Sequence, residues 1–185
     1  LEDLKGRKIL APGPSGAWIA AVGAIPVDGS LTTYYNQIET GVAEGALSIM
    51  TGVYPLKIHE VAPYVTISGV GANMIGAFGV NRDIWEDLPE DVRAVLTELG
   101  EEYSATNARV IEERYQSVVE KLREDPKVTV TELSQEDRAK WAAALPDLAG
   151  NWAASHADGA DLIAAYMAAL KESGGTALRD WTIVK

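Results

Sequence analysis

The sequence predicts an α/β fold. Along residues 1–80, short apolar runs of strand length alternate with glycine-rich turns and helix signals, a pattern typical of αβ units around a parallel or mixed sheet. A helical pattern without proline then runs from residue 90 to residue 125, and further helix signals follow residue 131. At 185 residues, the chain can bury a sizeable core as one or two domains.

The first strand and helix are expected on either side of a glycine-rich turn. Residues 8–11 predict the strand, Pro12–Gly16 the turn and Ala17–Val22 the helix. This order places free backbone N–H groups at a helix N-terminus, which suits an anionic or carbonyl ligand. An ordinary αβ turn explains the pattern equally well, because the motifs of a phosphate loop and of a nucleophile elbow are missing. Ala24–Val27 predicts a short strand, and its proline places it near a sheet edge.

The stretch Leu31–Met50 predicts a second αβ unit. Thr32 or Thr33 can cap its helix, because a hydroxyl there accepts from the N–H groups of the first turn. Gly41 can end the helix in the left-handed conformation. The apolar run Ala46–Ile49 that follows predicts a buried strand.

Two further strands and a short helix are expected before the long helical pattern. Residues 56–62 predict the short helix, which Pro63 ends. Residues 64–68 alternate in polarity as a strand does, and Ile75–Val80 predicts an apolar strand. The glycine-rich link between these strands lacks the third glycine of a dinucleotide fingerprint, so we assign it flexibility.

A long helix is predicted from Asp87 to Leu122. Asp87 can cap it, Pro89 suits its first turn, and apolar residues recur at three- and four-residue steps. A continuous helix of this length spans about 50 Å, which is enough to brace two bodies. A break near Gly100 is the alternative.

The C-terminal part predicts a short strand at 128–130 and several helices. Ser134–Asp137 resembles a capping box with Asp in place of Glu. An apolar face is expected from Trp141 to Trp152, bent at Pro146, and a last helix from Asp158 or Gly159. Five residues of that helix are expected to face the core: Leu162, Ile163, Tyr166, Met167 and Leu170.

Composition excludes several functions. The net charge of −11 repels phosphate backbones and anionic lipids, so we expect no nucleic-acid binding. Absence of cysteine removes disulfides, thiolate catalysis and Cys–zinc sites. No apolar run reaches the roughly 20 residues of a membrane span, so we expect no direct membrane insertion. Because the chain opens on Leu1 without an initiator methionine, we expect a mature or trimmed start.

No catalytic or metal-binding motif is found. His59 and His156 belong to no metal-binding pair, and we expect a solvated or capping role for each. The carboxylates recur on predicted helix surfaces and are interpreted as solvated. Four aromatic residues follow the early strands, where ligands of open α/β sheets bind, although core packing explains them as well: Trp18, Tyr34, Tyr35 and Tyr54.

Five segments in order carry a family resemblance. They are DLKGRKILAPG, VGAIPV, YYNQIETGVAEGALS, KIHEVAPYVTISG and GVNRDIWEDLPEDVRAVL, between residues 3 and 96. With the helix that follows to Leu122, the chain resembles the DctP family of TRAP transporter solute-binding receptors.

The resemblance implies a periplasmic-binding-protein-like (type II) second lobe with a long inter-lobe helix and C-terminal helices, lacking most of the N-terminal lobe. The expected division is an α/β ligand-binding lobe at 1–74, a returning strand, bracing helix and short strand at 75–130, and C-terminal helices at 131–185. The strand at 75–80 would return to the absent lobe.

The implied function is capture of a small organic solute, an organic acid or a less charged relative, without catalysis or cofactor. The implied partners are the membrane subunits of a TRAP permease, and the implied compartment is the periplasm after signal-peptide removal. Self-association of the chain is a further expectation. The alternatives are an α/β-scaffold hydrolase using Ser15 or Ser48 with His59, and a helix-mediated interaction or oligomerisation module.

Two departures from the family pattern bear on the solute. Leu10 stands where the family carries an arginine that grips a substrate carboxylate, and Ser48 stands where an asparagine often contacts ligand. We therefore expect a less acidic or more apolar ligand than a C4-dicarboxylate, with any carboxylate held by backbone N–H groups near Ser15 or by the other lobe. The expected ligand-binding residues are Leu10, Ser15, Trp18, Ser30, Tyr34 and Ser48.

Overall fold

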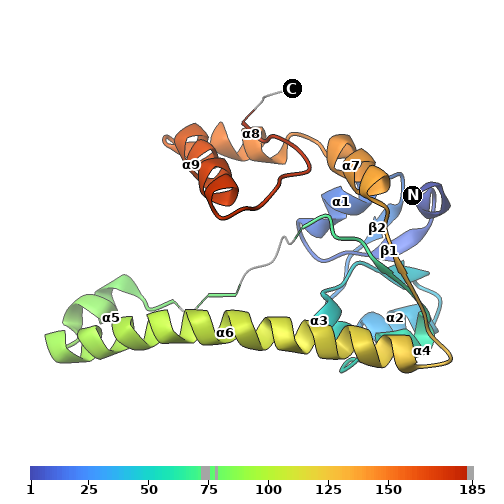
Figure 1. Cartoon of the computed structure of the whole chain (residues 1–185), viewed down its shortest axis with the longest axis horizontal. Coiled ribbons are helices and arrows are strands. Elements are labelled where there is room, and N and C mark those ends of the chain that lie inside the picture. The colour runs from blue at the N-terminus through green and yellow to red at the C-terminus, as the bar shows by residue number, and fades with distance from the viewer. Residues whose placement is uncertain (72–75, 78, 183–185) are drawn as a thin grey trace.

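The computed structural model describes residues 1–71, 76–77 and 79–182, and shows an α/β body from which one long helix projects (Figure 1). The strands are β1 (Lys8–Leu10), β2 (Ile25–Val27), β3 (Gly45–Ala46), β4 (Tyr64–Ile67) and β5 (Thr129–Glu132). The helices are a 3-10 turn (Glu2–Leu4), α1 (Ser15–Ala21), α2 (Tyr34–Glu39), α3 (Met50–Val53), α4 (Ile58–Val61), α5 (Arg82–Asp87), α6 (Glu90–Glu124), α7 (Gln135–Ala144), α8 (Leu148–Ala153) and α9 (Gly159–Glu172).

The first sheet has the strand order β2-β1-β3, and all its pairs are parallel. Leu10 of the central strand lies opposite Val27 on one side and Ala46 on the other. The strand that contains Pro26 is an edge strand, as predicted, since proline cannot donate to a second neighbour. The predicted strand at residues 46–49 is wrong in length. After Ala46 only the Leu47 N–H continues the ladder, 2.8 Å from the Leu10 carbonyl, and Ile49 is exposed.

The helix α2 begins at Tyr34, directly after one of its two predicted capping residues, but the predicted cap hydrogen bond is not formed. Thr33 occupies the N-cap position, but its side chain accepts no cap hydrogen bond from the helix. Its hydroxyl contacts the Ser30 carbonyl and the Gln37 side chain instead, which joins the loop after β2 to the helix. The predicted helix end is confirmed, because Gly41 adopts φ +75°.

The second sheet pairs β4 with β5 in parallel, from Tyr64 opposite Thr129 to Ile67 opposite Glu132. The predicted strand at residues 75–80 is wrong where it can be compared: Gly76, Ala77, Gly79 and Val80 form no strand, and residues 75 and 78 lie outside the described residues. A strand needs a neighbour to satisfy its backbone groups. In the described part of the chain, β4 pairs only with β5.

The helix α6 is continuous over 35 residues and passes through Gly100 without a break. Asp87 does not cap it, because that residue ends the additional helix α5, and Pro89 holds the N-cap position instead. The C-terminal third of α6 packs on the α/β body. We call α5 and the N-terminal half of α6 (residues 82–107) the projecting arm, because they extend away from that body (Figure 1).

The core consists of two clusters on opposite faces of the first sheet. Successive strand residues point to opposite faces, so Ile9 and Leu10 belong to different clusters. Ile9 packs with residues of α1 and α7, among them Ile19 and Trp141. Leu10 packs with residues of α2, α3, α4 and the C-terminal end of α6, including the fully buried Leu122. The sheet is therefore covered on both faces, as parallel sheets require.

The C-terminal helices follow the predicted sequence positions but not the predicted burial. Ser134 caps α7 by accepting from the Asp137 N–H at 3.1 Å, which confirms one half of the capping box. The apolar face is broken after Pro146, and Trp152 is exposed. Leu162 and Tyr166 of α9 are also exposed, Tyr166 by 68%. The expectation that five residues of α9 face the core is wrong for these two, because α8 and α9 pack chiefly on each other, whereas Ile163, Met167 and Leu170 are half-buried.

An arginine of the tail ties these helices to the body. The guanidinium of Arg179 donates to the carbonyls of Leu145 and Pro146, at the corner between α7 and α8. The same group lies 4.1 Å from the centroid of the Trp181 ring. These contacts satisfy backbone carbonyls that the end of α7 leaves free.

The continuity of α6 predicts the effect of replacing its glycine. A Cβ at Gly100 would meet nothing within 4 Å, so Gly100→Ala should stabilise the protein by about 0.5–1 kcal/mol in urea unfolding. Gly41→Ala is the matched control, because a Cβ there is equally unhindered but φ is +75°. It should destabilise by about 1–2 kcal/mol. Destabilisation by Gly100→Ala would show that the helix is broken there.

The burial of Tyr34 predicts a stability loss at alkaline pH. Burial, with a smaller effect of Asp28, raises the pKa of the Tyr34 phenol from 10.0 to about 12. The unfolded state therefore loses this proton first. The corresponding stability is complete below pH 10 and disappears between pH 10 and 12, a loss of about 2–3 kcal/mol.

Urea unfolding at pH 8 and at pH 12 tests this loss. Tyr34→Phe should remove it, and should be nearly neutral at pH 8, because the buried hydroxyl has no partner among the described residues. Tyr64→Phe, at an exposed residue, is the control. Equal pH dependence of wild type and Tyr34→Phe would contradict the prediction.

Candidate functional site

The carboxyl ends of the three strands of the first sheet lie at one edge. Because β1, β2 and β3 are parallel, the segments that follow Leu10, Val27 and Ala46 leave the sheet together. In open α/β sheets, ligands bind outside the carboxyl ends of the strands. This edge is therefore the candidate site, and the six predicted ligand-binding residues all lie on or just after these strands.

The structure brings Leu10 and Tyr34 together beneath the loop after β2. A Cβ on Gly29 would lie 3.1 Å from Leu10 Cδ2 and 3.4 Å from Tyr34 Cε1, so the loop backbone packs directly on both side chains. Both residues are 0% exposed. They form the apolar floor of this part of the edge and offer no charge or accessible polar atom.

Ser30 and Ser48 lie on the two outer segments of the edge. Ser30 is exposed, and its hydroxyl lies 2.8 Å from the hydroxyl of Thr32. Ser48 is half-buried, and its hydroxyl donates to the Ile49 carbonyl at 3.2 Å. Both hydroxyls can accept or donate to a small polar ligand after modest rotation.

Ser15 and Trp18 lie on α1, which covers the face of the sheet opposite to Leu10. Ser15 is buried, and Trp18 packs half-buried against the first core cluster. The expectation of free N–H groups near Ser15 is wrong. The N–H groups of residues 15, 16 and 17 donate to the carbonyls of residues 12, 13 and 14 at 3.1–3.2 Å, because the turn closes on itself.

The two histidines take no part in this edge. His59 is buried rather than solvated: its ring stacks on Tyr54 with centroids 4.7 Å apart, and its Nδ1 lies 3.4 Å from the Val53 carbonyl. His156 stacks on Trp152 and contacts the carbonyl of that residue through Nδ1 at 2.9 Å. In the described part of the chain, no cluster of three His, Asp or Glu could hold a metal ion.

The guanidinium of Arg7, just before β1, is already paired. The guanidinium of Arg7 forms an ion pair and hydrogen bond with Glu44, and the Lys8 N–H also donates to that carboxylate. These bonds lower the pKa of Glu44, the hydrogen bond from Arg7 most of all. Arg7 therefore points to the amino end of the sheet and is not available at the carboxyl edge.

Sequence reasoning missed Arg138, an arginine on α7 near this region. Its guanidinium packs on the backbone of Gly69, just after β4, and its Nε is buried without a hydrogen-bond partner among the described residues. The sequence holds only a weak signal for it: Arg138 and Lys140 are the two basic residues between the capping Ser134 and Trp141.

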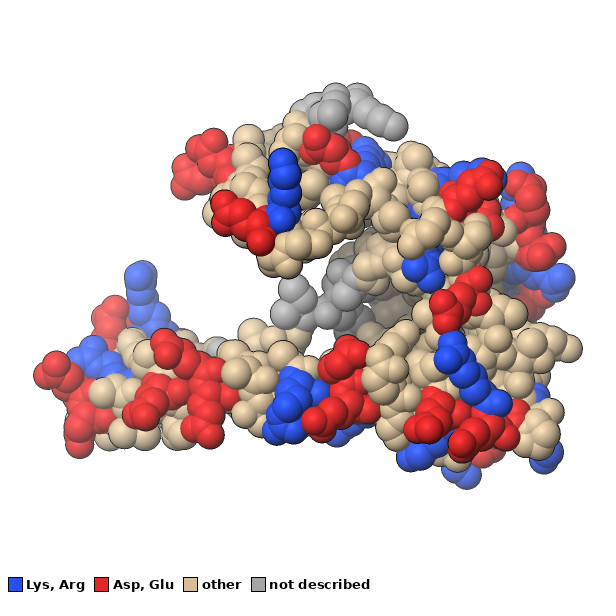
Figure 2. All heavy atoms as spheres, viewed as in Figure 1, with Lys and Arg blue, Asp and Glu red and all other residues tan. Residues whose placement is uncertain are grey.

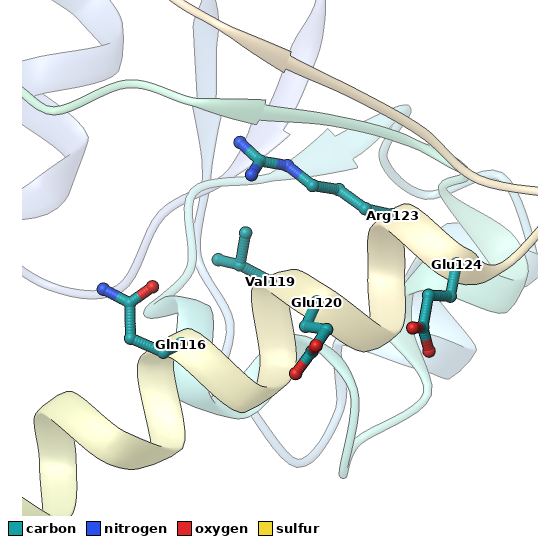
Figure 3. Close-up of a pocket in the computed structure, with 5 residues that line it drawn as sticks. All are labelled: Gln116, Val119, Glu120, Arg123 and Glu124. Atoms are coloured by element: carbon teal, nitrogen blue, oxygen red, sulfur yellow. The ribbon is translucent and has the colours of Figure 1, made fainter.

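Two open hollows lie on the surface, and none of the six predicted residues lines either. One, of about 420 Å³, runs along the flank of α6 and is lined by Gln116, Val119, Glu120, Arg123 and Glu124 (Figure 3). Its arginine is paired with Glu132 at 2.7 Å. The other, of about 540 Å³, lies between the end of α9 and the tail. Neither hollow is lined by residues that follow the strands of the first sheet, so we place the candidate site at the strand ends.

Comparison with known proteins assigns the chain to a family. The model of the bacterial extracellular solute-binding proteins, family 7 (DctP), matches residues 1–155. The C4-dicarboxylate-binding periplasmic protein DctP of Rhodobacter capsulatus is 29% identical over 153 residues, which cover 82% of this chain and 45% of the relative. A solute-binding protein of Sulfitobacter sp. (strain NAS-14.1) is 31% identical over 140 residues, or 74% of this chain and 42% of the relative.

Solved structures show the same fold. The ectoine-binding protein of the TeaABC TRAP transporter of Halomonas elongata has a TM-score of 0.76 at 21% identity and covers 92% of this chain and 56% of its own. A TRAP solute-binding protein of Desulfovibrio salexigens with bound orotic acid has a TM-score of 0.74 at 22% identity, covering 90% and 54%. The predicted type II fold is confirmed, although the chain spans only about half the length of these proteins. The chain belongs to the DctP family of bacterial extracellular solute-binding proteins.

Proposed function

We propose that this chain is the second-lobe portion of an extracytoplasmic receptor that captures a small organic solute for a TRAP-type secondary transporter. The observation that carries this proposal is the convergence of three parallel strand ends at one edge, with hydroxyl side chains on two of the following segments. Membership of the DctP family supports it. Solute capture would take place in the periplasm, and the membrane subunits of the permease would receive the solute.

The solute is an organic acid with fewer negative charges than a C4-dicarboxylate. Among the similar proteins, two are named for binding C4-dicarboxylates and ectoine, and two were solved with bound β-D-galacturonate and orotic acid. Here the floor of the edge is Leu10, which is buried and apolar, and Arg7 is held by Glu44. A second carboxylate would be desolvated at this edge without a cation beside it, which is unfavourable.

The receptor binds without catalysis. A serine hydrolase needs a histidine that reaches the nucleophile. The Nδ1 of His59 faces the Val53 carbonyl and its ring is stacked on Tyr54, while the Ser48 hydroxyl donates to the Ile49 carbonyl.

Among the helices that the structure describes, none combines the length and the apolar character of a membrane span.

We keep the proposed division of the chain into residues 1–74, 75–130 and 131–185, except that β5 is assigned to the α/β lobe. Because β5 pairs with β4 along four residues, the strand after the long helix belongs to the same body as the α/β lobe. The long helix then leaves and rejoins that body, which suits an element that joins two lobes.

A solute screen tests the proposed function. Thermal shift and calorimetry on the full-length protein should find an organic acid that raises its melting temperature. A ligand at 100 times its Kd stabilises by about 2.7 kcal/mol. Among succinate, malate, monocarboxylates, sugar acids and ectoine, a singly charged solute should bind most tightly. Tightest binding of succinate would contradict the charge argument, and absence of any binding would contradict the function.

Self-association of the 185-residue chain is a second candidate property, favoured by the projecting arm. Val95, Leu96 and Leu99 of the arm are all exposed, Leu99 by 52%. Figure 2 shows acidic side chains gathered over the same arm, where Asp and Glu outnumber Arg between residues 82 and 102. Apolar area favours association of two copies, and the shared negative charge opposes it.

Light scattering against protein concentration tests self-association. The mean mass should rise with concentration, and rise further with added salt, because salt screens the repulsion between arms. Leu99→Glu should abolish the rise, whereas Thr97→Glu adds the same charge at an exposed polar residue of α6 and should reduce it only at low salt. A monomeric mass at every concentration would refute this property.

A further inference from the structure

Arg138 of α7 is a half-buried arginine that forms no ion pair within the part of the chain that the structure describes. Its Nε is buried and makes no hydrogen bond to any described residue. Five other arginines do have a carboxylate partner: Arg7, Arg82, Arg109, Arg123 and Arg179. A buried charged donor without an acceptor costs about 1–3 kcal/mol or more. Only the Nε of this guanidinium is among the buried unpaired atoms, so a ligand carboxylate can reach the guanidinium through its terminal nitrogens.

The guanidinium occupies a defined position at the end of β4. The place where a Cβ of Gly69 would stand lies 2.7 Å from Arg138 Cζ, 2.8 Å from Nε and 3.0 Å from Nη1. Gly69 also has φ +61°, so two independent features favour glycine there. The arginine thus lies against bare backbone, and any larger residue at 69 would displace it.

The same loop connects Arg138 to the candidate site. Gly71 packs on Trp18, since a Cβ there would lie 3.6 Å from Cη2 of the ring. One turn after Arg138, the Trp141 indole N–H donates to the Trp18 carbonyl at 2.9 Å. Loop 69–71 is therefore bordered by Arg138 at one end and by Trp18 at the other, and Ser15 lies one turn earlier on α1.

Neighbouring charges on α7 leave Arg138 unsatisfied. Glu136 and Asp137 adjoin it in sequence, but both carboxylates face Lys140, at 2.7 and 3.8 Å from Nζ. Asp137 also accepts the Ser134 hydroxyl at 2.9 Å. The lysine and the cap thus hold the two carboxylates that could otherwise neutralise the arginine.

We propose that Arg138 binds the carboxylate of the solute, with the Trp18 ring beside it. This inference rests on the proposed function. It assigns a cation to the solute carboxylate, because Leu10 is apolar, the N–H groups at the start of α1 are already bonded, and Arg7 is paired with Glu44. A guanidinium presents two parallel N–H donors that match one carboxylate, which fits a solute with a single negative charge. Trp18 then favours an apolar or planar group next to that carboxylate.

The first test uses acetate as the probe and does not depend on the natural solute. In the wild-type chain, the Nε–H signal of Arg138 is followed by NMR during an acetate titration, and Arg114 of α6 is the internal reference. The Arg138 signal should shift saturably while that of Arg114 does not, and benzoate should saturate it at lower concentration than acetate. Equal small shifts of both signals would overturn the inference.

The second test uses the organic acid found in the solute screen. Arg138→Gln should raise its Kd by about 10- to 100-fold, since a hydrogen bond to a charged group contributes about 1.5–3 kcal/mol. Arg138→Lys keeps the charge and should recover only part of the affinity, and Arg114→Gln should change nothing. Far-UV circular dichroism verifies that each variant is folded.

The outcomes separate the two proposals. Unchanged solute affinity in a folded Arg138→Gln variant would overturn the role of Arg138 and leave the receptor function intact. A saturable acetate shift at Arg138 with no solute found in the screen would overturn the receptor function and support the anion site.

Discussion

The burial of the last turns of α6 on the first sheet is the contact on which the remaining architecture depends. Val118 and Leu122 enter the core on the face that carries Leu10, and Leu122 is fully buried. This packing fixes where the long helix ends and hence where β5 begins. Because β5 then pairs with β4 in parallel, the chain returns to the body and delivers α7 onto α1. Apolar burial at one end of α6 therefore positions elements that are more than 100 residues apart in sequence.

The two faces of the sheet have different consequences for binding. The Leu10 face is closed by Tyr34, by the short helices and by α6, so it supplies rigidity and an apolar floor. On the Ile9 face, α1 and α7 meet through the bond between Trp141 and Trp18, and the loop after β4 lies between Arg138 and Trp18. The polar groups near the strand ends are otherwise engaged locally, in turns, caps and ion pairs. The site proposed at this edge therefore depends on few polar contacts.

The projecting arm and the C-terminal helices carry apolar residues that this chain leaves uncovered. Leu99 on α6 and Tyr166 on α9 are each more than half exposed, whereas the last turns of α6 are buried. Figure 1 shows that the arm and α9 both extend to the same side of the α/β body. Relatives of the family are about twice as long as this chain, so they contain additional protein that the described elements do not include. The uneven burial along α6 supports the proposal that this helix joins two lobes.

Periodicity and turn chemistry alone predicted much of the fold. The strand at β1, the edge position of Pro26, the stop at Gly41, the unbroken α6 and the cap at Ser134 follow from local rules, since each depends on residues near in sequence. Other features depended on contacts that the sequence does not display. The length of β3, the burial of His59, the exposure of Tyr166 and the closure of the turn before Ser15 are set by which elements become neighbours. Arg138 belongs with these, because the burial of its Nε depends on the packing of its guanidinium against the backbone of Gly69, which is distant in sequence.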